Sequence, residues 1–154
     1  MAGIAGFLNG ILAVIHKSQY QYISGKLDAW SDSDPDVEAW PFAFGAFQII
    51  VNRQTLLHRD PSGRAGMYDL VLTVGDYGEQ AYMALPALGV SLPYDSGTVV
   101  ALDAVALQHG VPHVDGHRIC IAFFNRGETI KVWEGNGEVR IGLPTMDDFL
   151  SGSI

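Results

Sequence analysis

Hydrophobic positions near the N-terminus recur at helical spacing. Apolar side chains fall three or four residues apart through residues 4–15, and residues 22–23 continue the same stripe two turns later. Polar Ser18 and Gln19 interrupt the stripe, so a break is expected near them. We predict one or two helices over residues 3–27, whose apolar face covers a sheet.

Acidic residues dominate the next stretch. Residues 28–38 contain five acids and one proline, a composition typical of a solvated linker. The stretch lacks the glycine and the terminal glutamate of a calcium-binding EF-hand loop. We therefore predict a linker at 30–39 between a helical segment at 1–29 and the rest of the chain.

From residue 42 onward, short apolar runs alternate with turn residues, which is typical of an all-β core. Strands are predicted at 42–52, 54–58, 67–74, 80–85, 90–92, 98–102, 105–109, 118–125, 129–133 and 138–141. A tight turn that ends at Gly97 is expected over 94–97, and a short helix at 146–150. The core would span 40–142, followed by a tail at 143–154. The pattern predicts one domain of mainly β structure, a sandwich or barrel buttressed by N-terminal helices.

Composition and charge narrow the functional classes. The chain has 154 residues, 48% hydrophobic and 17% charged, with a net charge of −8. Proteins that bind nucleic acid tightly usually present a basic surface, so the charge argues against strong DNA binding by this domain alone. With Cys120 as its one cysteine, the chain forms no internal disulfide, which suits an intracellular compartment. The apolar run at 4–15 is too short to span a bilayer, so no membrane association is expected.

Two histidines and one aspartate suggest a metal site. His58 and Asp60 are two residues apart, so on a strand both side chains point to the same face. His109 follows after a further predicted strand. Two imidazoles and one carboxylate leave positions of an octahedral iron open, as oxygenases require. A chance His-x-Asp in a surface loop is the alternative interpretation.

Arg118 opens an apolar strand nine residues after His109. A cation at the start of a core strand is costly unless it pairs with a buried anion. A guanidinium binds a carboxylate through two parallel hydrogen bonds, so a dicarboxylate cosubstrate would satisfy it.

The order His58-x-Asp60, Gly97 in a tight turn, His109 and Arg118 resembles the Fe(II)/2-oxoglutarate dioxygenases. Residues 52–60, with 70–77 and 97–118, are similar to the fungal branch of the TET/JBP group. The resemblance covers residues 40 to 126. It implies a double-stranded β-helix, a jelly-roll or cupin-like barrel, and oxidation of 5-methylcytosine or thymine in DNA. The apolar residues expected to line the interior of that barrel are Leu70, Leu72, Val100, Leu102 and Phe124.

Carried over residue by residue, the resemblance makes His58, Asp60 and His109 the iron ligands and pairs Arg118 with 2-oxoglutarate. Fe(II) and O2 complete the reaction, and 2-oxoglutarate leaves as succinate. Many relatives have Ser or Thr two residues after the arginine; here Cys120 stands in that position and is a poorer donor. The base-reading asparagine of TET enzymes has no counterpart in residues 61–63, so base recognition does not transfer.

Three further candidates for contact with the cosubstrate, Asn52, Arg53 and Tyr68, have two interpretations each. Asn52 and Arg53 either contact the cosubstrate or are a turn asparagine and a solvated arginine. Tyr68 either reaches a carboxylate of the cosubstrate or packs at the rim of the core. His16 is interpreted as a residue on a helix surface.

Three functions remain open at this stage. The first is a TET/JBP-type oxygenase acting on methylated bases in DNA, which would place the protein in the nucleus. The second is the same iron chemistry on a small molecule or a protein side chain, which the acidic charge would accommodate more easily. The third is a catalytically silent barrel that serves as a binding module, against which the intact ligand set argues.

Overall fold

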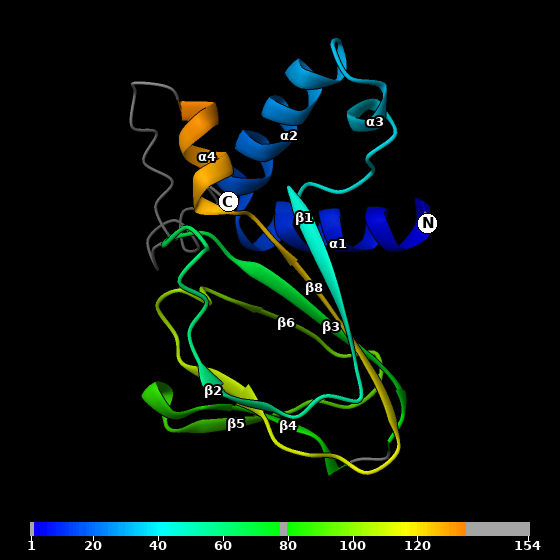
Figure 1. Cartoon of the computed structure of the whole chain (residues 1–154), viewed down its shortest axis with the longest axis vertical. Helices are drawn as coiled ribbons and strands as arrows, with labels where there is room; N and C mark the ends of the chain where they lie inside the picture. The colour runs from blue at the N-terminus through cyan, green and yellow to red at the C-terminus, as the bar shows by residue number, and fades with distance from the viewer. Residues whose placement is uncertain (1, 78–79, 135–154) are drawn as a thin grey trace. The chain divides into compact units, whose positions relative to one another are not determined.

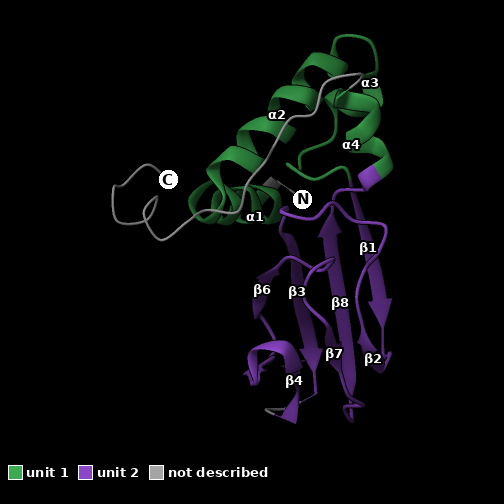
Figure 2. Ribbon diagram, turned by 90° about the vertical axis from the view of Figure 1, so that its left-hand side faces the viewer, with its two compact units in different colours: residues 1–45, 128–154 green, residues 46–127 purple. Residues whose placement is uncertain are grey.

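The computed structural model describes residues 2–77 and 80–134. The chain divides into two compact units, residues 1–45 with 128–154, and residues 46–127 (Figure 2). Within the described residues, no helix is both long and apolar enough to cross a membrane.

The first unit is helical. Helix α1 (Ala2–Ile15) and helix α2 (Lys17–Ser31) are separated at His16, two residues before the expected break. His16 is fully buried and caps α2, its ring nitrogen accepting a hydrogen bond from the backbone N–H of Gln19. The prediction of a surface histidine was therefore wrong, because a polar side chain that caps a helix can be buried with its partner.

Part of the predicted linker is helical. Helix α2 extends to Ser31, and a short helix α3 (Pro35–Glu38) follows. The Asp34 carboxylate accepts from the backbone N–H of Asp36, and Pro35 occupies the first turn. Asp34, Asp36 and Glu38, three of the five acids that suggested a linker, therefore cap or start a helix, where negative charge is favourable. Most of their side chains are exposed, as expected.

The second unit contains all the described strands, in two four-stranded antiparallel sheets (Figure 1). The first sheet has the order β1-β8-β3-β6, with strands Ala46–Val51, His117–Phe124, Asp69–Asp76 and Val99–Leu102. The second has the order β2-β7-β4-β5, with strands Thr55–His58, His109–Val111, Tyr82–Leu85 and Val90–Pro93. A 3-10 turn, η2 (Pro86–Leu88), joins the last two.

Consecutive strands alternate between the two sheets over most of the chain. Each sheet therefore takes its members from both halves of the unit, and the strand order is that of a double-stranded β-helix. The predicted mainly β fold is confirmed. The turn at Gly97 is also confirmed, because its φ of 94° is in the left-handed region that favours glycine.

Side-chain alternation places one face of the first sheet against a buried core. Val71, Val100 and Leu102 pack with Met83 and Tyr94 between the sheets. Leu70 and Leu72 are buried on the other face of β3. Of the residues expected to line the interior, Val100, Leu102 and Phe124 do so, whereas Leu70 and Leu72 do not.

Two predicted strands are not strands. Residues 104–106 form a turn, because the Asp103 carboxylate accepts from the backbone N–H groups of Val105 and Ala106, and of the strand predicted at 105–109 His109 alone lies in a strand. Residues 129–133 belong to helix α4 (Gly127–Glu134), in which Ile130 is buried and Lys131 and Val132 are exposed. The strand expected at 138–141, the helix at 146–150 and the tail at 143–154 lie outside the described residues.

Candidate metal and cosubstrate site

A cavity of about 260 Å³ lies between the two sheets of the second unit. Alternate residues of β8, from Arg118 to Phe124, form part of its wall. Strands β2 and β7 close it from the second sheet and contribute His58 and His109. All the residues that the sequence suggested as metal ligands therefore face one cavity.

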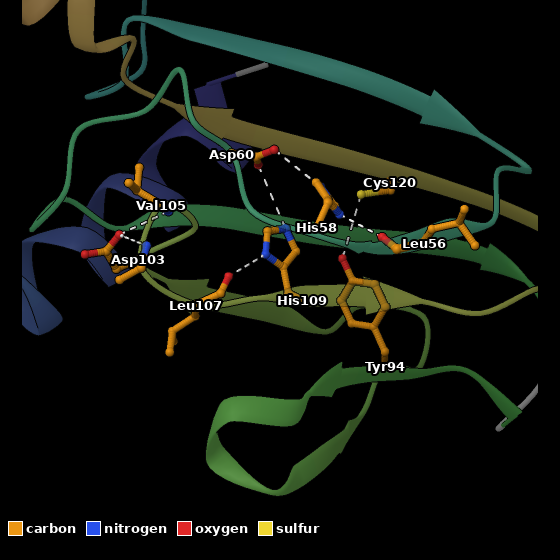
Figure 3. A network of polar contacts seen from close by, with 10 residues as sticks. Leu56, His58, Asp60, Tyr94, Asp103, Val105, Leu107, His109 and Cys120 are labelled. Carbon is orange, nitrogen blue, oxygen red and sulfur yellow. Dashed lines mark hydrogen bonds and ion pairs between the residues drawn. The ribbon is translucent and has the colours of Figure 1, made fainter.

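Three side chains meet at this cavity (Figure 3). His58 Nε2 lies 3.3 Å from Asp60 Oδ1, and His109 Nε2 lies 3.9 Å from Asp60 Oδ2. The two imidazole rings are 4.4 Å apart between centroids. One ligand atom from each residue lies within 4.8 Å of the others, and among the described residues this is the group of donors close enough to share a cation.

Backbone carbonyls orient both imidazoles. His58 Nδ1 is 2.9 Å from the carbonyl oxygen of Leu56, and His109 Nδ1 is 3.0 Å from that of Leu107. A carbonyl only accepts, so each Nδ1 donates its proton, and Nε2, the ring nitrogen nearer Asp60, is the atom available to a metal. This second hydrogen bond is the arrangement that fixes metal-binding histidines in proteins.

Burial also favours the metal-binding form of His109. Removal from water lowers the pKa of this imidazole, and the neighbouring His58 lowers it further. The hydrogen bond to Leu107 and the charge of Asp60 act in the opposite direction but are smaller effects than burial. The ring is therefore held neutral, as metal ligation requires.

Asp60 is held by the chain that connects β6 to β7. Its backbone N–H donates to the carbonyl of Ala104, 2.9 Å away. Asp103 orders that connection through bonds to Val105, Ala106 and Gly66, the last at 2.8 Å. The turn that positions Asp60, two residues after the end of β2, is thus part of the same connection that leads to His109 at the start of β7.

Gly110 allows the strands that carry the two histidines to approach closely. A Cβ atom at this position would lie 2.9 Å from the carbonyl oxygen of Thr55 and 3.0 Å from the backbone nitrogen of Leu57. Both contacts are with backbone atoms, which can move aside less easily than the end of a flexible side chain. A glycine beside His109 is therefore a steric condition for pairing β7 with β2.

Arg118 is buried in the cavity wall, with 4% of its surface exposed. Its Nη2 donates to the carbonyl of Arg53 at 2.7 Å. Its Nη1 is buried without a hydrogen-bond partner among the described residues. A buried guanidinium with an unused donor facing a cavity is costly unless an anion binds there, so this arrangement fits a carboxylate ligand.

Cys120 and Tyr94 lie beside Arg118. Cys120 is the next residue of β8 after Arg118 that lines the cavity. Burial raises the pKa of its thiol, which therefore remains protonated. Tyr94 was not identified from the sequence, where it formed part of a predicted turn. It is fully buried, and its hydroxyl lies 3.8 Å from Cys120 Sγ and 3.4 Å from the carbonyl of Val71. Both contacts are long, so the hydroxyl can also serve a ligand.

Two candidates are not brought to the cavity. Asn52, with φ of 50°, bonds instead to the backbone of Arg118, whose N–H donates to Asn52 Oδ1 at 2.8 Å. Tyr68 is half-buried and is not part of the cavity lining. Arg53, for which both interpretations were open, does line the cavity.

The next residue after Tyr68 faces the cavity in its place. Asp69 is 8% exposed and lies on the cavity wall, on β3. Burial, with repulsion from Asp60 and Asp103, raises its pKa from 3.8 to about 8. Sequence reasoning missed Asp69, although an acid at the start of an apolar strand is an uncommon combination that could have revealed it.

Comparison with known proteins places the chain in a family. Residues 1–127 match the family model of the Tet_JBP domain, described as an oxygenase domain of the 2OGFeDO superfamily. A search of curated proteins gave no match.

Two solved structures are similar to this chain. The first is NgTET1 in complex with 5mC DNA, with 10% sequence identity and a TM-score of 0.69 over 99% of this chain and 56% of the other. The chain thus spans little more than half of that protein. The second is the viral collagen prolyl hydroxylase vCPH from Paramecium Bursaria Chlorella virus-1, with 15% identity and a TM-score of 0.33 over 65% of each chain. The first similarity supports the fold, and the second is too weak to add to it. On the family match, the chain belongs to the Tet_JBP oxygenase domains of the Fe(II)/2-oxoglutarate dioxygenase superfamily.

Proposed function

We propose that this domain uses Fe(II) and 2-oxoglutarate to oxidise 5-methylcytosine or another modified base in nucleic acid. The observation that carries the proposal is one cavity that holds both a cluster of metal donors and a buried guanidinium with an unused donor. The superfamily implies the metal and the cosubstrate, and the residues present suit both.

His58, Asp60 and His109 would hold the iron. The two imidazoles would bind through Nε2, because each Nδ1 is bonded to a carbonyl, and Asp60 would supply a carboxylate oxygen. Three protein ligands leave coordination positions free. When bound, the iron would supply activation of dioxygen at the expense of 2-oxoglutarate, which is converted to succinate and CO2.

Arg118 would bind the far carboxylate of 2-oxoglutarate. Its Nη1 has no hydrogen-bond partner among the described residues. Its Nη2 donates to the carbonyl of Arg53, which holds the guanidinium in place. Tyr94 would donate a second hydrogen bond, which supplies the hydroxyl that Cys120 lacks. The pair therefore anchors one end of the cosubstrate and leaves its other end directed along the cavity.

Part of the cavity wall is apolar. Ile50, Val71, Met83 and Val111 are among the residues that line it. Such walls limit the access of water, which protects a reactive centre from side reactions and strengthens the electrostatic contacts within it. The protein's own contribution is thus to hold ligands, orient the cosubstrate and exclude solvent.

Nucleic acid is the preferred substrate because the fold resembles that of NgTET1, which was solved with 5mC DNA. Arg53 and Arg126 are exposed cations that line the cavity and could contact phosphates at its rim. One observation favours the second candidate, hydroxylation of a small molecule or a protein side chain. The net charge of −8 opposes binding of a polyanion by this domain alone.

The test is incubation of the protein with Fe(II), 2-oxoglutarate and methylated duplex DNA, followed by mass spectrometry of the nucleosides. The proposal predicts oxidised 5-methylcytosine, and its absence in the matched Asp60→Ala variant. Succinate without any oxidised base would contradict the nucleic-acid substrate and favour the second candidate. Absence of succinate under all conditions would contradict the oxygenase activity itself.

A further inference from the structure

Asp69 is a buried carboxyl group that the metal and cosubstrate sites do not use. It lies at the start of β3, 8% exposed, and faces the cavity together with Val71. Among the described residues, its side chain takes part in no hydrogen bond or ion pair. Buried carboxyl groups normally have partners, so one that lines a cavity without a partner is a candidate for contact with a ligand.

The strand register places Asp69 far from the cosubstrate anchor. Leu70 pairs with Phe123, so Asp69 is level with Phe124, whereas Gly75 pairs with Arg118 at the other end of β3. Six residues of extended chain between Arg118 and Phe124 correspond to roughly 20 Å. If Arg118 anchors 2-oxoglutarate, as proposed above, Asp69 lies at the end of the cavity that is left for the primary substrate.

The surroundings of Asp69 favour a neutral carboxylic acid. The carboxylates of Asp60 and Asp103 are the charged groups that repel its ionised form, and His58, His109 and Arg126 also line the cavity. Burial is the largest cause of its raised pKa. A carboxylic acid differs from a carboxylate in offering one O–H donor next to one carbonyl acceptor.

We propose that Asp69 is a specificity-determining residue, which binds the primary substrate by donating one hydrogen bond and accepting another from adjacent ring atoms. This inference rests on the proposed function. The matching chemistry is an amidine edge such as that of a cytosine base, where ring N3 accepts and the neighbouring amino group donates. Enzymes that act on an extruded base read this edge, and a carboxyl group is a suitable partner for the amino group of cytosine.

Two substitutions of Asp69 test the proposal against a purely structural role. Asp69→Asn keeps a donor beside an acceptor and is never ionised, whereas Asp69→Leu has similar bulk and no hydrogen-bonding atoms. Each variant and the wild type are assayed on a duplex containing 5-methylcytosine, with separate KM values for the DNA and for 2-oxoglutarate. Circular dichroism melting checks the fold, and Asp69→Ala, which also lacks hydrogen-bonding side-chain atoms, replaces the leucine variant if that one does not fold.

We expect the leucine variant to change the kinetic constants for the DNA but not those for 2-oxoglutarate. Asp69→Leu should lower kcat/KM for the methylated DNA by about tenfold or more, the effect of losing hydrogen bonds in a dry site, with the KM for 2-oxoglutarate little changed. Asp69→Asn should stay within about threefold of the wild type, because it keeps a donor beside an acceptor.

Other outcomes overturn the proposal. Equal activity of the leucine variant and the wild type would show that Asp69 does not contact the substrate. A loss in Asp69→Asn as large as that in Asp69→Leu would show that the neutral donor and acceptor pair is not what the substrate requires. If the wild type oxidises no base, the nucleic-acid substrate and this inference fail together, while continued succinate formation would leave the metal and cosubstrate sites intact.

Discussion

Asn52 and Arg118 hold one another through two hydrogen bonds of 2.8 Å. The backbone N–H of Asn52 donates to the carbonyl of Arg118, and the backbone N–H of Arg118 donates to Asn52 Oδ1. The asparagine therefore holds the backbone of Arg118, the proposed anchor of the cosubstrate, without entering the cavity. Its φ of 50° is one that asparagine and glycine tolerate better than other residues.

The first prediction concerns this pair. Asn52→Gly keeps the backbone conformation but removes the side-chain acceptor, so the strand that carries Arg118 loses a bond of about 1 kcal/mol. We expect the KM for 2-oxoglutarate, measured by succinate formation, to rise roughly three- to tenfold. The control is Asn52→Asp, which keeps the acceptor and should resemble the wild type. An unchanged KM in the glycine variant would show that Asn52 does not position Arg118.

The second prediction concerns the approach of β7 to β2. Gly110→Ala introduces a methyl group that would lie 2.9 Å from the carbonyl oxygen of Thr55. The strands must separate, which moves His109 away from His58 and costs roughly 1–3 kcal/mol in stability. Metal affinity, measured with Mn(II) by calorimetry, should fall together with the melting temperature.

The matched control for that variant is Gly89→Ala, since a Cβ atom at Gly89 meets no heavy atom within 4 Å. Its φ of 66° adds backbone strain, so its stability should fall, but its metal affinity should not. Wild-type metal affinity in Gly110→Ala would refute the steric argument.

The third prediction concerns the two groups beside Arg118. Tyr94→Phe removes a buried hydroxyl that we assign to the cosubstrate carboxylate. A lost hydrogen bond of about 1 kcal/mol corresponds to a roughly fivefold higher KM for 2-oxoglutarate. Cys120→Ser should act in the opposite direction, because a hydroxyl is a stronger donor than a thiol. If both variants matched the wild type in kinetic assays, neither group would bind the cosubstrate.

The fourth prediction concerns pH and stability. The pKa of Asp69 is about 8 in the folded protein, compared with 3.8 for an aspartate side chain without these interactions. Between these values, the folded protein holds a proton that the unfolded chain has released. The free energy of unfolding therefore falls as pH rises through this window, and the change levels off above about pH 8.

Asp69→Asn removes this titration. The stability of the variant relative to the wild type should therefore increase from about pH 5 to about pH 8 and then remain constant. Urea unfolding of the metal-free protein at several pH values measures the difference. A constant difference across the whole range would show that Asp69 is ionised in the folded protein.

The candidate metal ligands could be predicted from the sequence, because the residue types and their order were sufficient to identify them. His58, Asp60 and His109 were identified from spacing and resemblance, and the structure brings their donor atoms within 4.8 Å. Arg118 was identified from the cost of a cation at the start of an apolar strand, and the structure buries it in the same cavity. Their roles as ligands remain predictions.

The residues that were missed or misplaced depend on contacts distant in sequence. Alternation on β3 does not say which face is inside, so Leu70 and Leu72 were expected where Asp69 and Val71 lie. The prediction of a strand at 105–109 failed because the Asp103 side chain bonds to the local backbone and forms a turn. Such capping competes with strand pairing and does not alter hydrophobic periodicity.

The most direct test of the central claim is calorimetric titration of the metal-free protein with Mn(II), a stable substitute for Fe(II), for the wild type and Asp60→Ala. If His58, Asp60 and His109 form one site, the wild type binds one ion per chain, and loss of the anionic ligand weakens binding by more than about 100-fold, beyond the effect of second-layer substitutions. Equal affinity and stoichiometry in the two proteins would contradict the account.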